Sequence, residues 1–144
     1  MAITSAVCNS FKTEILTAVH NFTAGGANVF NLALYTSSAT LNKSTTVYIT
    51  SGEVATATGY TAKGKALTSV TPVLSTDTAV CDFDNISWTS ASFTANGGLI
   101  FNDTATGDPA CCAIAFGGDK TVTSGTFTVE FPAPAAATAI IAIA

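Results

Sequence analysis

Charged side chains are scarce in this 144-residue chain: they make up 10% of it, and none of them is arginine. Five lysines stand against nine acids, which gives a formal net charge of −4 and a pI near 4.5. Nucleic-acid binding needs a basic footprint and usually the forked donors of arginine. The composition therefore argues against nucleic-acid binding, and against a site that clamps phosphate through arginine.

Histidine and paired cysteine motifs are equally scarce. A hydrolase of the Ser-His-acid type needs a histidine, and the sole one, His20, falls near the end of a predicted helix, where the helix dipole favours a protonated ring. We interpret His20 as a helix-end polar residue or an interface contact. The four cysteines show no CxxC spacing, and the adjacent Cys111 and Cys112 should point to opposite faces of a strand. We expect buried thiols, with a disulfide between distant members as the alternative, and no metal or cofactor.

Clustered carboxylates are limited to one pair, Asp82 and Asp84, which as i and i+2 on a strand could bind calcium or perform acid/base work. A pair at the end of a strand, entering a turn at Asn85, is the commoner arrangement. The sequence holds no EF-hand loop, P-loop or nucleotide fingerprint. We therefore expect no catalytic residues and a protein that is not an enzyme.

Long hydrophobic runs are also missing. The longest apolar stretch, residues 135–144, is half the length of a membrane span, and its Ala-Ile alternation indicates a final strand. The first residues show neither a basic region nor an apolar core of a secretory signal. We expect no membrane partner and synthesis in a cytosol.

Threonine and serine replace charge as the polar component. The chain has 25 Thr and 12 Ser, about a quarter of all residues. Its length is that of one ordinary domain, so we expect a single domain over 1–144. A neutral, Thr-rich surface without clustered titratable groups is typical of a binding or structural module rather than an enzyme.

Residues 5–22 carry apolar side chains at helical spacing, namely Val7, Phe11, Ile15, Val19 and Phe22. This pattern predicts an amphipathic helix over 5–22. Thr4 or Ser5 could supply the N-cap, and the Gly25-Gly26 pair could supply the left-handed stop.

Beyond Gly26 the apolar period shortens to 2, and β-branched and aromatic residues dominate. We expect β structure over 28–143, interrupted by a long surface loop at about 37–64 that holds at most one short strand. Deleting residues 37–58 should leave a folded domain that has lost its binding surface, and retained binding would remove the loop from the interface. Turns are predicted at Asn96–Gly98, Thr106–Pro109 and Gly117–Lys120. The candidate strands are 28–36, 65–74, 78–83, 86–94, 98–102, 111–116, 125–131 and 138–143.

Short strands with frequent turns and a single leading helix predict a mainly β fold, an antiparallel β-sandwich or jelly roll with one N-terminal α-helix. A parallel α/β fold is excluded because no helices are interleaved. Seven aromatic residues should fill much of the core: Phe83, Trp88, Phe93, Phe101, Phe116, Phe127 and Phe131.

Six segments, taken in order, cover most of the chain from about residue 28 onward. They are Leu32–Thr36, Gly59–Leu67, Asp82–Trp88, Ala91–Asn102, Phe116–Val129 and the apolar ending Ile140–Ile143. This ordered series resembles a group of small structural proteins encoded by tailed bacteriophages.

The resemblance implies a virion protein, most plausibly a decoration or cement protein on the outer surface of the head. Its expected partner is the major capsid protein, whose subunit joints it would stabilise after synthesis in the host cytoplasm. Capsid symmetry favours a homotrimer at local threefold sites. Open strand edges or an extended loop could augment a neighbouring sheet.

We expect the contact surface on the predicted helix or on the 37–64 loop. The candidate interface residues are Phe11, Ile15, His20, Tyr48, Val54 and Tyr60. Two alternatives stay open: a neck, tail or head-completion protein, and a glycan-binding fibre module. For glycan binding, the candidate residues are Tyr35, Tyr48, Tyr60 and Asp108.

Overall fold

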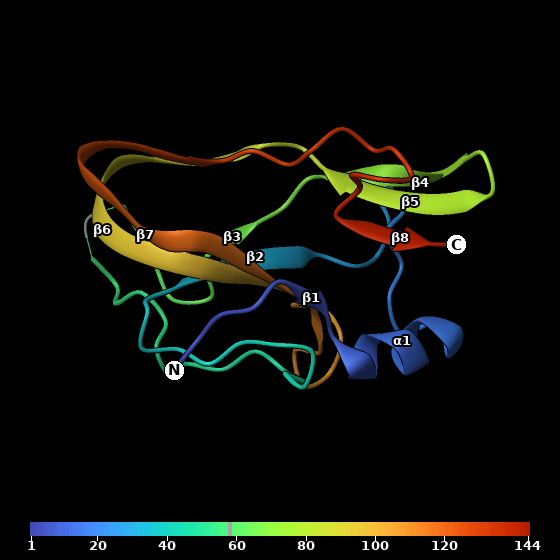
Figure 1. Ribbon diagram of the computed structural model, residues 1–144, viewed down its shortest axis with the longest axis horizontal. Helices are drawn as coiled ribbons and strands as arrows, with labels where there is room; N and C mark the ends of the chain where they lie inside the picture. The colour runs from blue at the N-terminus through green and yellow to red at the C-terminus, as the bar shows by residue number, and fades with distance from the viewer. Residues whose placement is uncertain (58) are drawn as a thin grey trace.

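The computed structural model describes residues 1–57 and 59–144, and the fold is mainly β with one short helix in these ranges (Figure 1). A five-stranded sheet has the order β1-β7-β6-β2-β3, and a three-stranded sheet has the order β4-β5-β8. All strand pairs in both sheets are antiparallel. The elements are β1 (Ala6–Val7), α1 (Asn9–Leu16), β2 (Phe30–Tyr35), β3 (Lys65–Ala66), β4 (Ser69–Ser75), β5 (Thr78–Phe83), β6 (Ile86–Asn102), β7 (Ala110–Val129) and β8 (Ile141–Ile143).

One long two-stranded ribbon, β6 with β7, forms most of the sheet structure. Its pairing runs from Phe101↔Ala110, beside the predicted turn at 106–109, to Ile86↔Val129 at its far end. Register shifts interrupt the pairing at several points, and the ribbon curves back over the rest of the molecule (Figure 1). The half of the ribbon near the β6–β7 turn pairs with β2. The other half curves over this part of the sheet.

Two of the predicted turns are wrong, because the ribbon continues through both glycine pairs. Gly97 and Gly98 pair with β2 on one side and with β7 on the other. A Cβ on Gly97 would collide with the carbonyl oxygen of Ile114, so this glycine serves close approach of the backbone. Gly117 and Gly118 have positive φ angles of 74° and 140° and lie within β7, where they distort the strand without ending it.

The core lies between the two halves of the ribbon and β2. Phe83, Trp88, Phe93 and Phe101 are buried as predicted, and the other predicted aromatics, Phe116, Phe127 and Phe131, are partly buried against them. β2 is buried along its whole length, which is expected of a central strand covered on both faces. The predicted strands at 28–36 and 78–83 are confirmed to within two residues at each end.

The helix is much shorter than the predicted span 5–22. Ala6 and Val7 pair with Ala113 and Cys112 of β7, so sheet pairing replaces the first helical turn. The Ser5 hydroxyl accepts a hydrogen bond from the Ala115 amide instead of capping the helix, and Cys8 occupies the N-cap position without a side-chain bond. The helix ends at Leu16, well before Gly25-Gly26, because the backbone turns left-handed at Ala18 (φ 59°).

The segment 37–64 contains no named strand among its described residues, but it is packed rather than free. Ala39, Leu41 and Val54 are buried in the core, and Leu41 exchanges backbone hydrogen bonds with the N-terminal segment. Residue 58 lies outside the described residues. Deleting residues 37–58 would remove these core side chains, and their burial argues against the expectation that the domain would still fold without them.

Gly64 offers a test of how closely this segment approaches β2. It has φ 68°, and an added Cβ would collide with the carbonyl oxygen of Leu32. We expect Gly64→Ala to lower the free energy of unfolding by about 3 kcal/mol or more. Gly107, with φ 86° and open space around it, is the matched control: Gly107→Ala should cost about 1 kcal/mol. Equal losses in urea denaturation would contradict the close approach.

Candidate functional site

A polar cluster centred on Glu53 brings together the three tyrosines of the chain. Tyr60 donates its hydroxyl to Glu53 Oε1 (2.8 Å), and Tyr48 donates to Glu53 Oε2 (2.5 Å). The Tyr60 oxygen also accepts the Leu34 amide of β2 at 2.9 Å, and Tyr35 donates to the Ile49 carbonyl at 2.6 Å. The cluster thus ties the 37–64 segment to a central strand.

Lys63 extends this cluster to the β6–β7 turn. Its backbone amide donates to Glu53 Oε1 at 2.7 Å, while its ammonium lies 2.8 Å from both Asp103 and Asp108. Hydrogen bonds to Asp103 first and Asp108 second raise the pKa of the Lys63 ammonium above its usual value. The two carboxylates therefore already have their counter-ion, and the group is a clamp between two loops.

The four residues suggested for glycan binding do not form an exposed platform. Tyr35 and Tyr60 are buried, so their rings offer no platform for a sugar. The partly buried Tyr48 ring stacks on Phe101 with 4.8 Å between centroids, and the Lys63 ammonium lies 5.7 Å from the Tyr48 centroid. Asp108 is committed to Lys63. These four residues do meet, but as an internal clamp.

His20 is buried beyond the helix rather than exposed at its end. Its Nε2 lies 2.9 Å from Glu14 Oε2, and its Nδ1 lies 3.3 Å from Asn102 Nδ2 and 3.8 Å from Cys111 Sγ. The tautomer with its proton on Nε2 fits this arrangement, because Nε2–H then donates to the carboxylate and the single lone pair of Nδ1 accepts from the Asn102 amide. His20 therefore anchors the segment after α1 to the sheet, and neither predicted role, helix-end residue or interface contact, matches this position.

The four cysteines are free and buried, as expected. Burial raises the pKa of the Cys8 thiol to about 11 and that of the Cys81 thiol to about 12, so both stay protonated and unreactive near neutral pH. No group of three or more His, Cys, Asp or Glu side chains in the described ranges could hold a metal ion. Asp84 lies beyond the end of β5 and is exposed, so it does not share a strand with Asp82.

Most of the predicted interface residues lie inside the fold. Phe11, His20, Val54 and Tyr60 are 2% to 6% exposed, and Ile15 and Tyr48 are partly buried against the core. These residues do not form a continuous outer surface.

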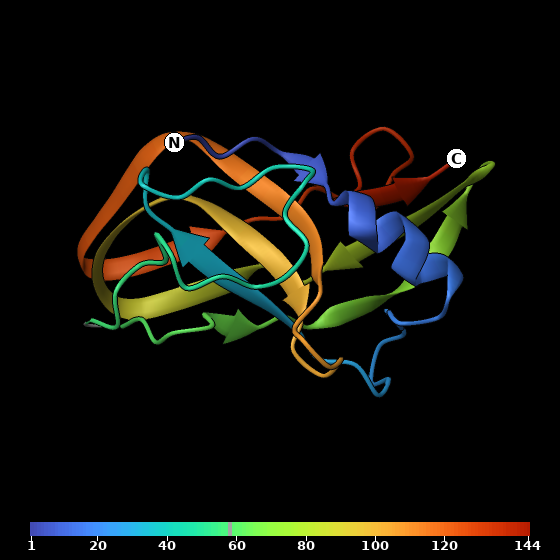
Figure 2. The same ribbon diagram turned by 90° about the horizontal axis from the view of Figure 1, so that it is seen from below.

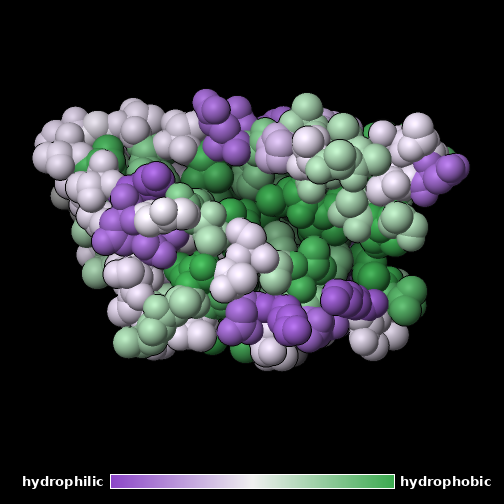
Figure 3. Space-filling view, in the orientation of Figure 1, coloured by the Kyte–Doolittle hydropathy of each residue, from purple (hydrophilic) through white to green (hydrophobic). Residues whose placement is uncertain are grey.

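An exposed apolar surface lies elsewhere, between α1 and the three-stranded sheet, and we call it the apolar end. Leu16, Leu74 and Ile143 are 86%, 71% and 52% exposed. Figure 3 shows hydrophobic atoms gathered between the helix and the sheet, and Figure 2 places both elements at the same end of the molecule. Sequence reasoning missed this surface because Leu16 fits the apolar stripe of the predicted helix and the sequence gives no sign that its stripe is left partly uncovered.

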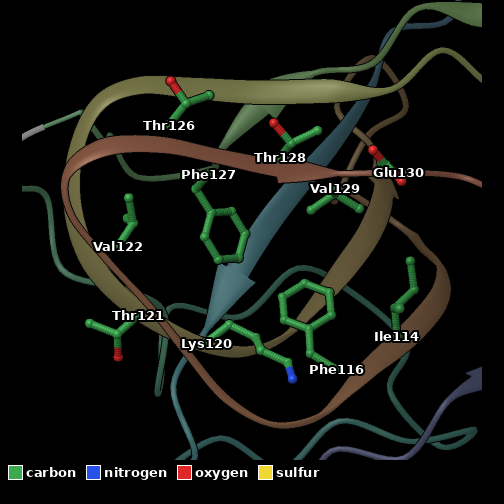
Figure 4. Close-up of a pocket in the computed structure, with 10 residues that line it drawn as sticks. All are labelled: Ile114, Phe116, Lys120, Thr121, Val122, Thr126, Phe127, Thr128, Val129 and Glu130. Carbon is green, nitrogen blue, oxygen red and sulfur yellow. The ribbon is translucent and has the colours of Figure 1, made fainter.

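A hollow of about 510 Å³ lies inside the curve of β7, and we call it the β7 groove (Figure 4). Its apolar residues are Ile114, Phe116, Val122, Phe127 and Val129, with Lys120 and Glu130 at its rim (Figure 4). Phe116 and Phe127 face each other across it, with 6.1 Å between ring centroids. The groove is an incompletely covered part of the core.

Comparison with known proteins gives no match: no family model, no curated protein and no solved structure is similar to this chain at a significant level. No helix in the described ranges is both long and apolar enough to cross a membrane.

Glu53 accepts three hydrogen bonds in a part-buried site, so its loss should be costly. We expect Glu53→Ala to lower the free energy of unfolding by about 2–4 kcal/mol, because two phenol hydroxyls and one amide lose their acceptor. Asp84→Ala, at an exposed carboxylate, should stay within about 0.5 kcal/mol of the wild type. Urea denaturation measures both, and a Glu53→Ala loss as small as that of Asp84→Ala would contradict the clamp.

The tyrosines also predict how stability depends on alkaline pH. Burial, assisted by Glu53, raises the pKa of Tyr48 to about 12, and burial raises those of Tyr35 and Tyr60 as well. The tyrosines of the unfolded chain ionise near pH 10. Their contribution to the free energy of unfolding should therefore be fully present below pH 10 and fall as the pH rises toward about 12. We expect tyrosinate absorbance to appear together with loss of circular dichroism. Full tyrosine titration near pH 10 in a chain that stays folded would contradict this linkage.

Proposed function

We propose that the chain is a non-enzymatic structural protein of a phage virion, a decoration or cement protein that binds the outer surface of the head. The choice of a phage head as the particle rests on the ordered resemblance to small phage structural proteins. The apolar end is the observation that carries the binding role, because it is an exposed apolar contact surface on a molecule that has few charged residues. The partner in this proposal is the major capsid protein.

The arrangement of the apolar end supports protein contact rather than chance exposure. Leu74, Ala79 and Ile143 are directly opposite one another across β4, β5 and β8, and therefore form one row on the same face. Ile143 and Leu16 line the same hollow beside α1. Contiguous exposed apolar residues of this kind mark interaction sites in soluble proteins.

The remaining surface supports a structural role without chemistry. Hydroxyl pairs link neighbouring strands of the ribbon, Ser87 with Thr128 and Thr94 with Thr121, each at 2.8 Å. Such short side chains lose little entropy on ordering, so they suit a protein that must remain soluble and then pack against a neighbour. We also propose that the architecture is an open β-sandwich of jelly-roll type. Its two layers are the curved ribbon and the sheet beneath it, and the ribbon itself joins them.

Copy number separates head decoration from a role in the neck or tail. We expect quantitative mass spectrometry of purified particles of the encoding phage to give a ratio to the major capsid protein that is near one or a simple lattice fraction. A handful of copies per particle would transfer the protein to the neck, the tail or a head-completion complex. Absence from particles would overturn the virion assignment.

Substitution at the apolar end tests the contact itself. We expect Leu16→Ser with Leu74→Ser to leave the thermal midpoint nearly unchanged, because both side chains are mostly exposed. Binding to particles stripped of the protein should weaken at least about tenfold, since each leucine would lose about 1.5 kcal/mol of burial. Val29→Ser, at a 46% exposed valine elsewhere, is the control. Equal binding of the double variant and the control would remove the apolar end from the contact.

A further inference from the structure

The outer edge of β7 is open over most of the strand. On one side β7 pairs with β6 from Ala110 to Val129, with gaps at the register shifts. On the other side β1 pairs only with Ala113 and Cys112, and the Ser5 hydroxyl accepts the Ala115 amide. From Phe116 to Val129, no strand in the described part of the chain covers this second edge. Its outward backbone groups are free to pair with another strand.

This edge carries register irregularities around Ser124, but it lacks the charge and proline that protect most edge strands of monomeric proteins. The nine residues Thr121–Val129 include no charge and no proline, and they are rich in Thr, Val and Phe. Natural edges are usually interrupted by lysine, proline or an inward charge, because an unprotected edge pairs with other chains. An edge of this composition is expected to have a strand partner in the working state of the protein.

The β7 groove also indicates that a strand partner belongs at this edge. Phe116, Val122 and Phe127 pack against the core but are only partly buried, and they line the hollow of about 510 Å³ (Figure 4). A strand added along the edge would cover these side chains and extend both walls of the curve. One added strand would therefore both pair with the open edge and cover these apolar residues.

The charges at the two ends of the edge indicate which neighbour fits. Lys120 and Glu130 lie five residues before and five residues after Gly125 and are both exposed. Neither forms an ion pair within the described part of the chain. A twofold axis near Gly125, which lies between the groove residues Val122 and Thr126, would pair this edge antiparallel with its own copy and bring Lys120 of each chain to Glu130 of the other.

We propose that the β7 edge is a self-association surface, at which two copies join their ribbons antiparallel through Thr121–Val129. The axis near Gly125 keeps the second copy away from β1, and Pro132 ends the pairing at the other side. The two β7 grooves then merge into one covered core. The trimer expected from capsid symmetry needs a head-to-tail contact, whereas this edge is complementary to itself. The proposal does not depend on the capsid partner, because the apolar end lies at the opposite end of the molecule.

A charge-swap series on the full chain tests the twofold pairing. Sedimentation equilibrium should show a dimer whose fraction rises with concentration, and Lys120→Glu or Glu130→Lys should each raise the dimer dissociation constant about tenfold, since each creates two like-charge contacts. The double variant Lys120→Glu/Glu130→Lys should restore the wild-type value. Failure of the double variant to restore association would overturn the pairing, as would a monomer or a trimer of the wild type.

Two further measurements keep the outcome independent of folding and of the proposed function. Thr126→Lys places a charge in the middle of the edge and should abolish the dimer, whereas Thr40→Lys, at an exposed threonine elsewhere, should not. Carbodiimide cross-linking of a mixture of ¹⁴N- and ¹⁵N-labelled protein should give mixed-label peptides that join Lys120 to Glu130. Same-label peptides alone would contradict the model of two joined copies. The Leu16→Ser/Leu74→Ser variant should dimerise normally, so that loss of particle binding and loss of the dimer are separate results.

Discussion

The antiparallel backbone pairing of β6 with β7 is the interaction on which the rest of the structure depends. A single hairpin of this length supplies strands to both sides of the core, so its two halves are joined covalently and by a ladder of backbone hydrogen bonds that several register shifts interrupt. The curve of the ribbon fixes where the core lies, and β2 and the aromatic side chains fill the space inside it. One cost follows directly: a ribbon has two edges, and each needs cover.

The chain covers one of these edges with its own irregular segment. The Lys65 ammonium donates to the Ser87 carbonyl on β6, and Gly59 lies against Ala91. Irregular segments have few backbone partners, and here the Glu53 clamp holds the segment on the sheet through side chains. His20 does the same for the segment after α1, through Asn102 and Glu14. The scarce ionisable groups are thus concentrated where secondary structure is weakest.

The contrast between predicted and observed elements follows from the same physics. Strands 30–35 and 78–83 and the turn at 106–109 were predictable, because local alternation and turn chemistry agree with the final fold. The helix was overestimated because Ala6 and Val7 satisfy helical spacing equally well, and only a distant strand decides their pairing. Gly97 indicated a turn, but the glycine is needed for close approach to Ile114. The clamp could be predicted only in part: the tyrosines were identified as candidate residues, whereas nothing in the sequence marks Glu53, the acceptor for Tyr48 and Tyr60.

The two uncovered surfaces lie at opposite ends of the long axis, the β7 groove at the curve of the ribbon and the apolar end beside α1 (Figures 1 and 2). A molecule with two such surfaces can connect neighbours on either side, and each contact can be weak, because binding at one end raises the effective concentration at the other. A joined pair of chains would present two apolar ends related by a twofold axis, and so could bridge two sites on a symmetric shell. The open edge that the long ribbon leaves behind would then be the means by which one small domain spans a joint between larger subunits.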